Sequence, residues 1–173
     1  MVEVYLKRHA FISMIISAIE VYKKECLGVL LGSRVDERYI VEYAIVYQTA
    51  ERLFAQVQTR KRQEKTLKIN LSYLSCYETV GDFHSHPQYG GIRAHTNLSA
   101  EDAEDLKETD LISLVISINE SSRHVAWHRK RTGIAGSIGQ FRISIGAHYW
   151  DRQAKRIDRA RIICPYALTF END

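Results

Sequence analysis

The chain contains few cysteine and proline residues. Its 173 residues include only three cysteines and two prolines. Cys26, Cys76 and Cys164 are widely spaced and form no Cys-x-x-Cys pair, so the sequence indicates neither a disulfide framework nor a cysteine zinc site. We expect Cys26 and Cys76 to be small buried hydrophobic residues.

Long hydrophobic runs are absent as well. The longest apolar stretches, such as residues 40–47, are far too short to cross a bilayer. The first residues lack the charged start, apolar run and cleavage site of a signal peptide. We therefore expect a cytoplasmic protein with no membrane association.

The charge balance is mild, because the net charge is +3 and charged residues make up 26% of the chain. This length predicts one domain over residues 1–173. Between Arg123 and Arg161, however, ten Lys or Arg residues accompany only Asp151 and Asp158. This segment is either a solvated face or a surface for nucleic acid or an acidic partner. No interleaved aromatic platform of the kind that binds single strands stands out in this segment, so it favours the solvated face over nucleic-acid binding.

Hydrophobic periodicity divides the chain into strands and helices. We expect strands over residues 2–6, 26–32, 39–49, 80–84, 111–118, 124–129 and 140–145, and helices over 10–23, 60–76 and 99–107. The last thirty residues fit either a helix or a strand. Strands dispersed among two or three helices predict an α/β fold, with a mixed central β-sheet flanked by helices.

The most informative feature is a pair of histidines one residue apart, His84 and His86, followed by Ser99 and Asp102. On a strand, residues two apart leave the chain on the same side, so both imidazoles are expected to point the same way. Ser99 is expected to cap the next helix, and Asp102 lies one turn further along the same helix face. Two imidazoles and a carboxylate, with one open position, are typical of a catalytic Zn²⁺ site.

Hydrolysis of an amide at such a site needs an activated water, a proton carrier and a group that stabilises the oxyanion. A bound zinc lowers the pKa of water to about 7, and a carboxylate can pass the proton to the leaving amine. Glu25, at the start of the apolar strand over residues 26–32, is suited to that second task. The hydroxyl of Ser99 could point into the same cavity.

These residues resemble the motif of the JAMM metalloprotease family, also called JAB or MPN. That motif is a Glu on an early strand, then His-x-His-Pro, then Ser-x-x-Asp, here Glu25, His84, His86, Pro87, Ser99 and Asp102. The resemblance extends over about residues 1–130 and implies a sandwich like that of cytidine deaminases. It implies a zinc-dependent isopeptidase or peptidase acting on conjugates of ubiquitin or ubiquitin-like modifiers. By this resemblance His84, His86 and Asp102 bind zinc, Glu25 is the general acid/base, and Ser99 helps to hold the tetrahedral intermediate.

The chain departs from the family in one respect. Residues 87–98 separate the second histidine from the serine, which is a longer loop than the family pattern has. We expect this loop, which contains Gly90 and Gly91, to be mobile. Its His95 could contact substrate, block the metal in the resting enzyme, or lie exposed on the surface as most loop residues do.

Three other functions are considered. A catalytically silent scaffold of the same superfamily would be expected to lose motif residues, and all are present. A zinc deaminase would need His-x-Glu and Pro-Cys-x-x-Cys, which do not occur. A nucleic-acid-binding module could use the basic segment. The sequence does not name the modifier, and it leaves a homo-oligomer open.

Overall fold

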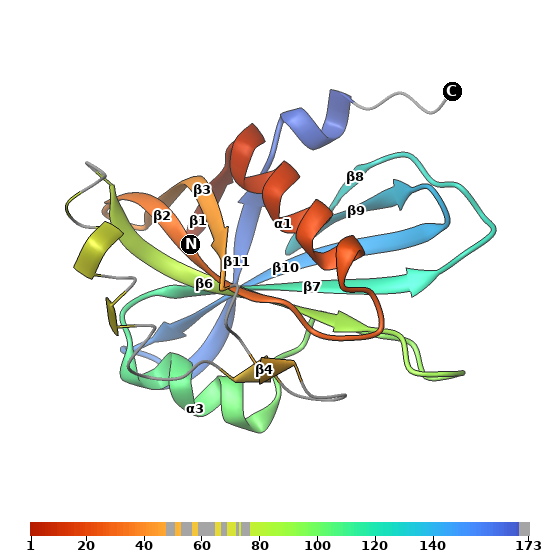
Figure 1. The fold of residues 1–173 in the computed structure, drawn as a ribbon. Coiled ribbons are helices and arrows are strands. Elements are labelled where there is room, and N and C mark those ends of the chain that lie inside the picture. The colour runs from red at the N-terminus through yellow and green to blue at the C-terminus, as the bar shows by residue number, and fades with distance from the viewer. Residues whose placement is uncertain are drawn as a thin grey trace.

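Strand β6 (Glu78–Pro87) runs through the middle of a curved, mixed β-sheet, between β2 (Leu27–Val35) and β7 (Ile112–Glu120) (Figure 1). The structure is a computed structural model that describes residues 1–47, 51–52, 57–58, 65–66, 69–71, 73 and 77–169. Strand β6 pairs antiparallel with β2 and parallel with β7. The His-Ser-His-Pro segment therefore ends a strand that has a partner on each side.

The other elements are β1 (Glu3–Leu6), α1 (Arg8–Glu20), β3 (Arg38–Val46), β4 (Glu51–Arg52), β5 (Val57–Gln58), α3 (Ala100–Glu108), β8 (His128–Lys130), β9 (Gly133–Ile138), β10 (Phe141–Asp151), β11 (Arg156–Ile163) and the 3-10 helix η1 (Tyr166–Thr169). Of these, β1, α1, β3, α3 and β10 match predicted elements. The sequence did not predict β4, β5 or β9, and it left the segment of β11 and η1 open between helix and strand. The strand predicted over 124–129 begins only at His128. The helix predicted over 60–76 falls mostly outside the described residues. Within this range the structure describes only residues 65–66, 69–71 and 73, and all of them are helical.

The predicted architecture, a mixed sheet flanked by two or three helices in a sandwich, is wrong. One edge of β10 pairs with β7, while its other edge pairs with β9 up to Gly146 and with β11 from Ala147 onward. Strand β11 also pairs with β1, so the sheet closes into a mixed barrel of seven strands, β11-β1-β3-β2-β6-β7-β10. The prediction failed because β11 carries charged residues that weaken its strand pattern, and because the pairing that closes the barrel joins β11 to β1 near the other end of the sequence.

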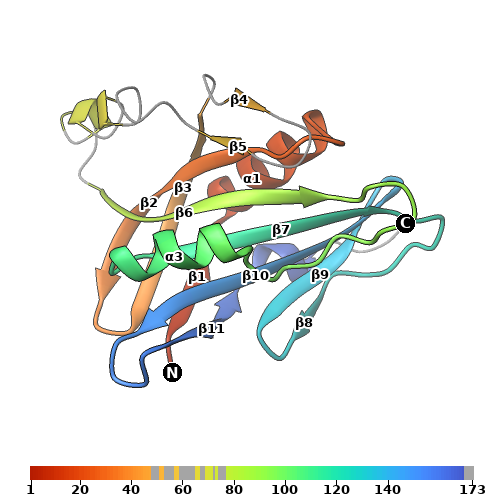
Figure 2. The ribbon, with the colours of Figure 1, turned by 90° about the horizontal axis from the view of Figure 1, so that it is seen from below.

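Helices α1 and α3 lie on opposite sides of the curved sheet (Figures 1 and 2). Helix α1 turns one apolar face toward the barrel, and its buried residues are Ala10, Phe11, Met14, Ile15 and Ala18. Helix α3 is short and mostly polar, and it buries only Leu106. Its place over the outer face of β7 and β10 brings its first turn toward the end of β6 that carries the histidines.

The main core joins the inner faces of the barrel strands to α1 and η1. Phe11 contacts the ring of Trp127 edge-on at 5.0 Å between centroids, and it lies 6.0 Å from the ring of Tyr166. Cys26 and Cys164 are fully buried, as expected for Cys26, whereas Cys76 lies outside the described residues.

Among the described residues, no helix has the length and the apolar character that crossing a membrane requires.

Replacing Phe11 tests the contribution of α1 to the barrel core. We expect Phe11→Ala to lower the free energy of unfolding by about 3–5 kcal/mol, because a fully buried aromatic ring leaves a cavity when it is removed. Urea denaturation measures this change. Ile16→Ala on the exposed face of the same helix is the control, and an equal loss in both variants would contradict the proposed packing.

Candidate metal centre

Strand β6 presents the two histidines of the motif on one face of the sheet. Phe83 and Ser85 alternate with them and are 0% and 1% exposed, because they point into the barrel. The rings of His84 and His86 lie 4.9 Å apart between centroids. The prediction that both imidazoles leave the strand on the same side is confirmed.

The N-terminus of α3 fixes the position of the third residue, Asp102. Ser99 is the N-cap, and its Oγ accepts a hydrogen bond from the Asp102 amide at 3.1 Å. In return, the Ser99 amide and hydroxyl both donate to Asp102 Oδ2, at 2.9 and 2.6 Å. This reciprocal capping box holds the carboxylate in one orientation, because both partners are fixed to the same helical turn.

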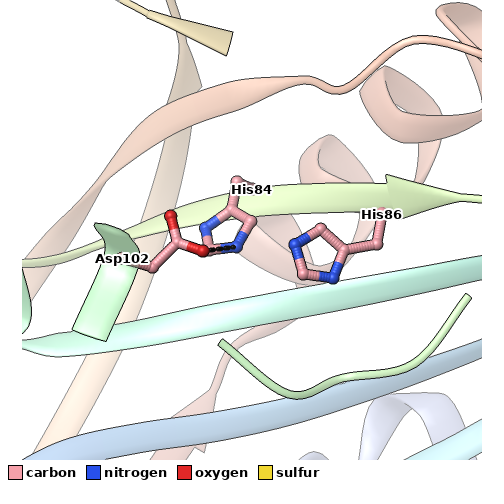
Figure 3. Close-up of side chains that lie close together, drawn as sticks. All are labelled: His84, His86 and Asp102. Carbon is pink, nitrogen blue, oxygen red and sulfur yellow. Dashed lines mark ion pairs between the residues drawn. The ribbon is translucent and has the colours of Figure 1, made fainter. Parts of the chain in front are cut away.

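The three side chains converge although they come from two separate elements (Figure 3). One potential ligand atom from each of His84, His86 and Asp102 lies within 4.8 Å of the others. Asp102 Oδ2 lies 3.5 Å from His84 Nε2, which is an ion-pair distance but a long one. The spacing suits three ligands that share one small cation.

The donor atoms fit such a cation. His84 Nε2 is buried and has no hydrogen-bond partner in the described part of the chain, which is costly unless something else binds it. His86 Nδ1 lies 3.0 Å from the carbonyl oxygen of His95. Because a carbonyl can only accept, Nδ1 carries the hydrogen, and Nε2 of His86 keeps its lone pair for a metal. Two imidazole nitrogens and one carboxylate oxygen are a donor set that zinc accepts.

Burial keeps the histidines in the form that a metal requires. Desolvation lowers the pKa of His84 and also that of His86, so both rings are neutral near pH 7. Burial by itself raises the pKa of Asp102, but its electrostatic interaction with the His84 ring, which is protonated only in acid, and the hydrogen bonds from Ser99 outweigh it, and the net pKa is lowered. The site therefore combines neutral imidazoles with an ionised carboxylate.

Glu25 lies in the turn between α1 and β2 and is held beside the histidine strand by backbone contacts. The Cys26 amide donates to Ser85 Oγ at 2.9 Å, and the Ser85 amide donates to the Cys26 carbonyl at 3.0 Å. The middle residue of His-Ser-His therefore ties the segment carrying Glu25 to the strand that carries the ligands.

The electrostatics of Glu25 also place it near this centre. Its pKa is raised to about 7, mainly by burial and further by the negative charge of Asp102. A carboxyl group with this pKa holds and releases a proton near neutral pH, which suits a general acid/base.

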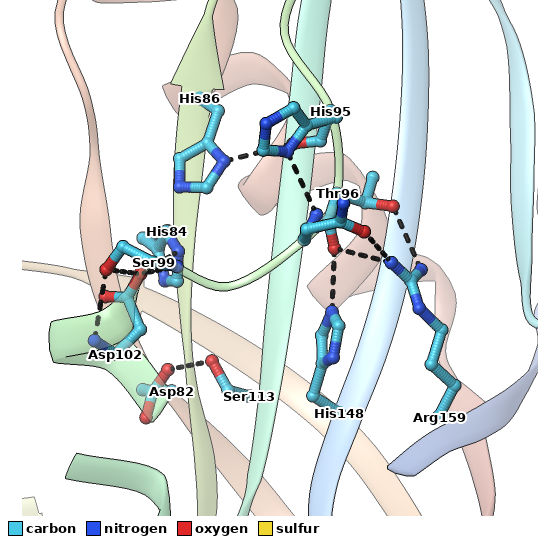
Figure 4. A network of polar contacts seen from close by, with 11 residues as sticks. Asp82, His84, His86, His95, Thr96, Ser99, Asp102, Ser113, His148 and Arg159 are labelled. Carbon is cyan, nitrogen blue, oxygen red and sulfur yellow. Dashed lines mark hydrogen bonds and ion pairs between the residues drawn. The ribbon is translucent and has the colours of Figure 1, made fainter. Parts of the chain in front are cut away.

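Residues 94–97 of the loop are fastened to the sheet by hydrogen bonds (Figure 4). The mobility of the part that contains Gly90 and Gly91 stays a prediction. Ala94 exchanges hydrogen bonds with the side chain of Asn119, at 2.8 and 3.2 Å. Thr96 accepts hydrogen bonds from His148 and Arg159. The side chain of His95 is exposed, and its ring lies edge-on to the ring of His86 at 6.0 Å between centroids, while its carbonyl oxygen accepts from His86 Nδ1.

Sequence reasoning missed His148 and Arg159 as residues of this region. His148 matches no ligand spacing in the sequence, and it lies on β10 with only 4% of its surface exposed. Arg159 lies on β11, in the segment whose secondary structure the sequence left open. No local pattern could have revealed them, because their contacts span 52 and 63 residues of sequence.

Comparison with known proteins gives one matching family model and a similar solved structure. A family model described as prokaryotic homologs of the JAB domain matches residues 7–130. The chain is also similar to the solution structure of protein DSY2949 from Desulfitobacterium hafniense, with a TM-score of 0.65 and 19% sequence identity over 93% of this chain and 92% of that one. At that identity the likeness concerns the fold alone. Among curated proteins, none matches the sequence.

The raised pKa of Glu25 predicts a pH-dependent stability of the metal-free protein. A carboxyl whose folded-state pKa is raised from 4.5 to about 7 stabilises the protein fully below its unfolded pKa, and this contribution is lost as the pH rises through about 7. As the pH rises from about 5 to 8, the free energy of unfolding of Glu25→Gln should therefore increase relative to that of the wild type. The increase should be on the order of 1 kcal/mol, because the side chain is only partly buried. Urea unfolding at several pH values measures it.

Glu108→Gln, at an exposed position of α3, is the matched control and should show no such gain over this range. A pH-independent difference between Glu25→Gln and the wild type would contradict the placement of Glu25.

Proposed function

The chain belongs to the family of prokaryotic homologs of the JAB domain, and from this premise we propose that it is a zinc-dependent metallopeptidase. Its proposed reaction is hydrolysis of isopeptide or peptide bonds to ubiquitin-like modifier proteins. The observation that carries the proposal is the convergence of His84, His86 and Asp102, with His84 Nε2 buried and unpartnered among the described residues.

In this proposal His84 and His86 would hold the zinc through Nε2, and Asp102 through its carboxylate. When bound, zinc supplies a Lewis acid that lowers the pKa of water and polarises a carbonyl group. Ser99 keeps the Asp102 carboxylate oriented by the two hydrogen bonds that it donates to Oδ2. The His95 carbonyl keeps the hydrogen of His86 on Nδ1, away from the site.

Glu25 is the proposed general acid/base. With a pKa of about 7 it can take a proton from the attacking water and return it to the leaving nitrogen. Burial next to Asp102 produces this pKa, so proton transfer and metal binding depend on the same arrangement of charges.

Ser99 is proposed to contribute a second interaction, with the tetrahedral intermediate. In the substrate-free structure its hydroxyl proton is directed at Asp102 Oδ2. To stabilise an oxyanion, this proton has to turn from Asp102 toward the substrate, which a hydroxyl can do by rotation about one bond. Ser99 would then serve first as a cap and later as a donor.

The basic segment gives little support to nucleic-acid binding as an alternative. Arg156 pairs with Asp158 at 2.9 Å, and Arg161 lies 3.6 Å from Glu3. Such internal partners compete with phosphate groups for the same guanidinium donors. The partner that we propose is a modifier conjugate or a peptide, and a cytoplasmic location remains our prediction.

Metal analysis combined with a cleavage assay tests the proposed function. Purified protein should contain about one zinc per chain, and His84→Ala or Asp102→Ala should lose it. Glu25→Gln should retain zinc but lower the turnover of ubiquitin-like modifier fusions by at least about 100-fold, because proton transfer is lost.

Glu108→Gln, on the exposed side of α3, serves as the control and should retain both metal and turnover. If the zinc-loaded protein cleaves no modifier fusion or peptide, a catalytically silent scaffold is the better account. If Glu25→Gln retains full turnover, the role of Glu25 is wrong.

A further inference from the structure

The long loop before α3 is attached to the sheet through Thr96. His148 Nε2 donates to the Thr96 carbonyl at 2.7 Å, and Arg159 Nη2 donates to the same oxygen at 3.2 Å. Arg159 Nη1 also donates to Thr96 Oγ1 at 3.1 Å, and its Nη2 reaches Asn97 Oδ1. One carbonyl and two side chains of the loop are thus held by residues from β10 and β11 (Figure 4).

Gly146 provides the space for this attachment. A Cβ atom at position 146 would lie 2.9 Å from Thr96 Cβ, Thr96 Oγ1 and Arg159 Nη1, which is closer than van der Waals contact allows. Gly146 is also the last residue of β10 that pairs with β9 before the same edge of β10 pairs with β11. The loop can therefore rest on the sheet here because no side chain stands between them.

The residue between the two attachment points is His95. Ala94 on one side is fixed by both polar atoms of the Asn119 side chain, and Thr96 on the other is fixed by His148 and Arg159. With both neighbours held, the peptide carbonyl of His95 has little freedom to move. This carbonyl is the group that accepts the Nδ1 hydrogen of His86.

We propose that Arg159 and His148 are positioning residues of the metal site: by holding Thr96 over Gly146, they keep the His95 carbonyl against His86 and so keep His86 Nε2 available as the metal-binding nitrogen. This inference rests on the proposed function in assuming that the cation is zinc. It gives the longer loop a role, since the loop supplies the outer partner that orients a ligand histidine. Both residues lie outside the 7–130 segment that the family model matches, so the site depends on strands beyond it.

The guanidinium of Arg159 is used for this contact rather than for a surface ion pair. Among the described residues no carboxylate forms a salt bridge with it, whereas Arg156 and Arg161 on the same strand each have one. The planar fork of arginine can reach the Thr96 carbonyl and hydroxyl together, and a lysine ammonium cannot reproduce that geometry.

Two measurements on the metal-stripped protein test the inference. The first is zinc affinity, from competition with a chromogenic chelator. The second is the tautomer of His86, from imidazole ¹⁵N NMR without metal at a pH where the ring is neutral. Arg159→Gln should weaken zinc binding about 10- to 100-fold and convert His86 from the Nδ1–H form to a mixture of tautomers. Arg159→Lys should lie between Arg159→Gln and the wild type.

Arg161→Gln is the matched control, because it removes the same charge from the same strand and should change neither quantity. Gly146→Val tests the contact without altering any charge, and it should reproduce the effect of Arg159→Gln by pushing Thr96 away. If both Arg159→Gln and Gly146→Val fold and leave zinc affinity and tautomer unchanged, the inference is overturned.

The two readouts also separate this inference from the proposed function. A wild-type protein that binds no zinc, but whose His86 changes tautomer in Arg159→Gln, would refute the metal site and retain the positioning role. If the wild-type protein binds zinc, but neither Arg159→Gln nor Gly146→Val changes the zinc affinity or the tautomer of His86, the metal site is retained and the positioning role is refuted.

Discussion

The candidate site depends on one buried nitrogen, His84 Nε2, which faces Asp102 and has no hydrogen-bond partner in the described part of the chain. Leaving such a group without a partner costs free energy, on the order of 1–3 kcal/mol. Protonating the ring would let it pair with Asp102, but burial opposes the charge and lowers the pKa of His84. A shared cation would resolve this conflict, because it would bind the neutral ring and the carboxylate together.

The surrounding structure maintains this arrangement from several directions. Strand β6 is held between β2 and β7, so the two imidazoles cannot separate without breaking the sheet. The capping box of Ser99 orients Asp102, and the contact of Ser85 with Cys26 holds the segment of Glu25. Each of these contacts involves a residue of the motif or its immediate neighbour in the sequence, which is why a short sequence pattern can specify much of the site.

The local parts of the structure could be predicted from the sequence for this reason. Alternation along β6 predicted the common direction of His84 and His86, and the N-cap preference of serine predicted the start of α3. The closed barrel could not be predicted, because it depends on pairing β11 with β1, which places Glu3 opposite Arg161, and the sequence left the structure of the β11 segment open. The attachment of Thr96 to Arg159 was missed because the two residues lie 63 positions apart in the sequence. Periodicity reports which face of an element is buried, but it does not report which distant element covers it.

The most direct test of the central claim is X-ray absorption spectroscopy at the zinc edge of the zinc-loaded protein. The account predicts a first shell of nitrogen and oxygen neighbours alone, at about 2.0–2.2 Å, with the outer-shell scattering of two imidazole rings. A sulfur neighbour at about 2.3 Å would contradict it, since a cysteine would then hold the metal in place of His84, His86 and Asp102.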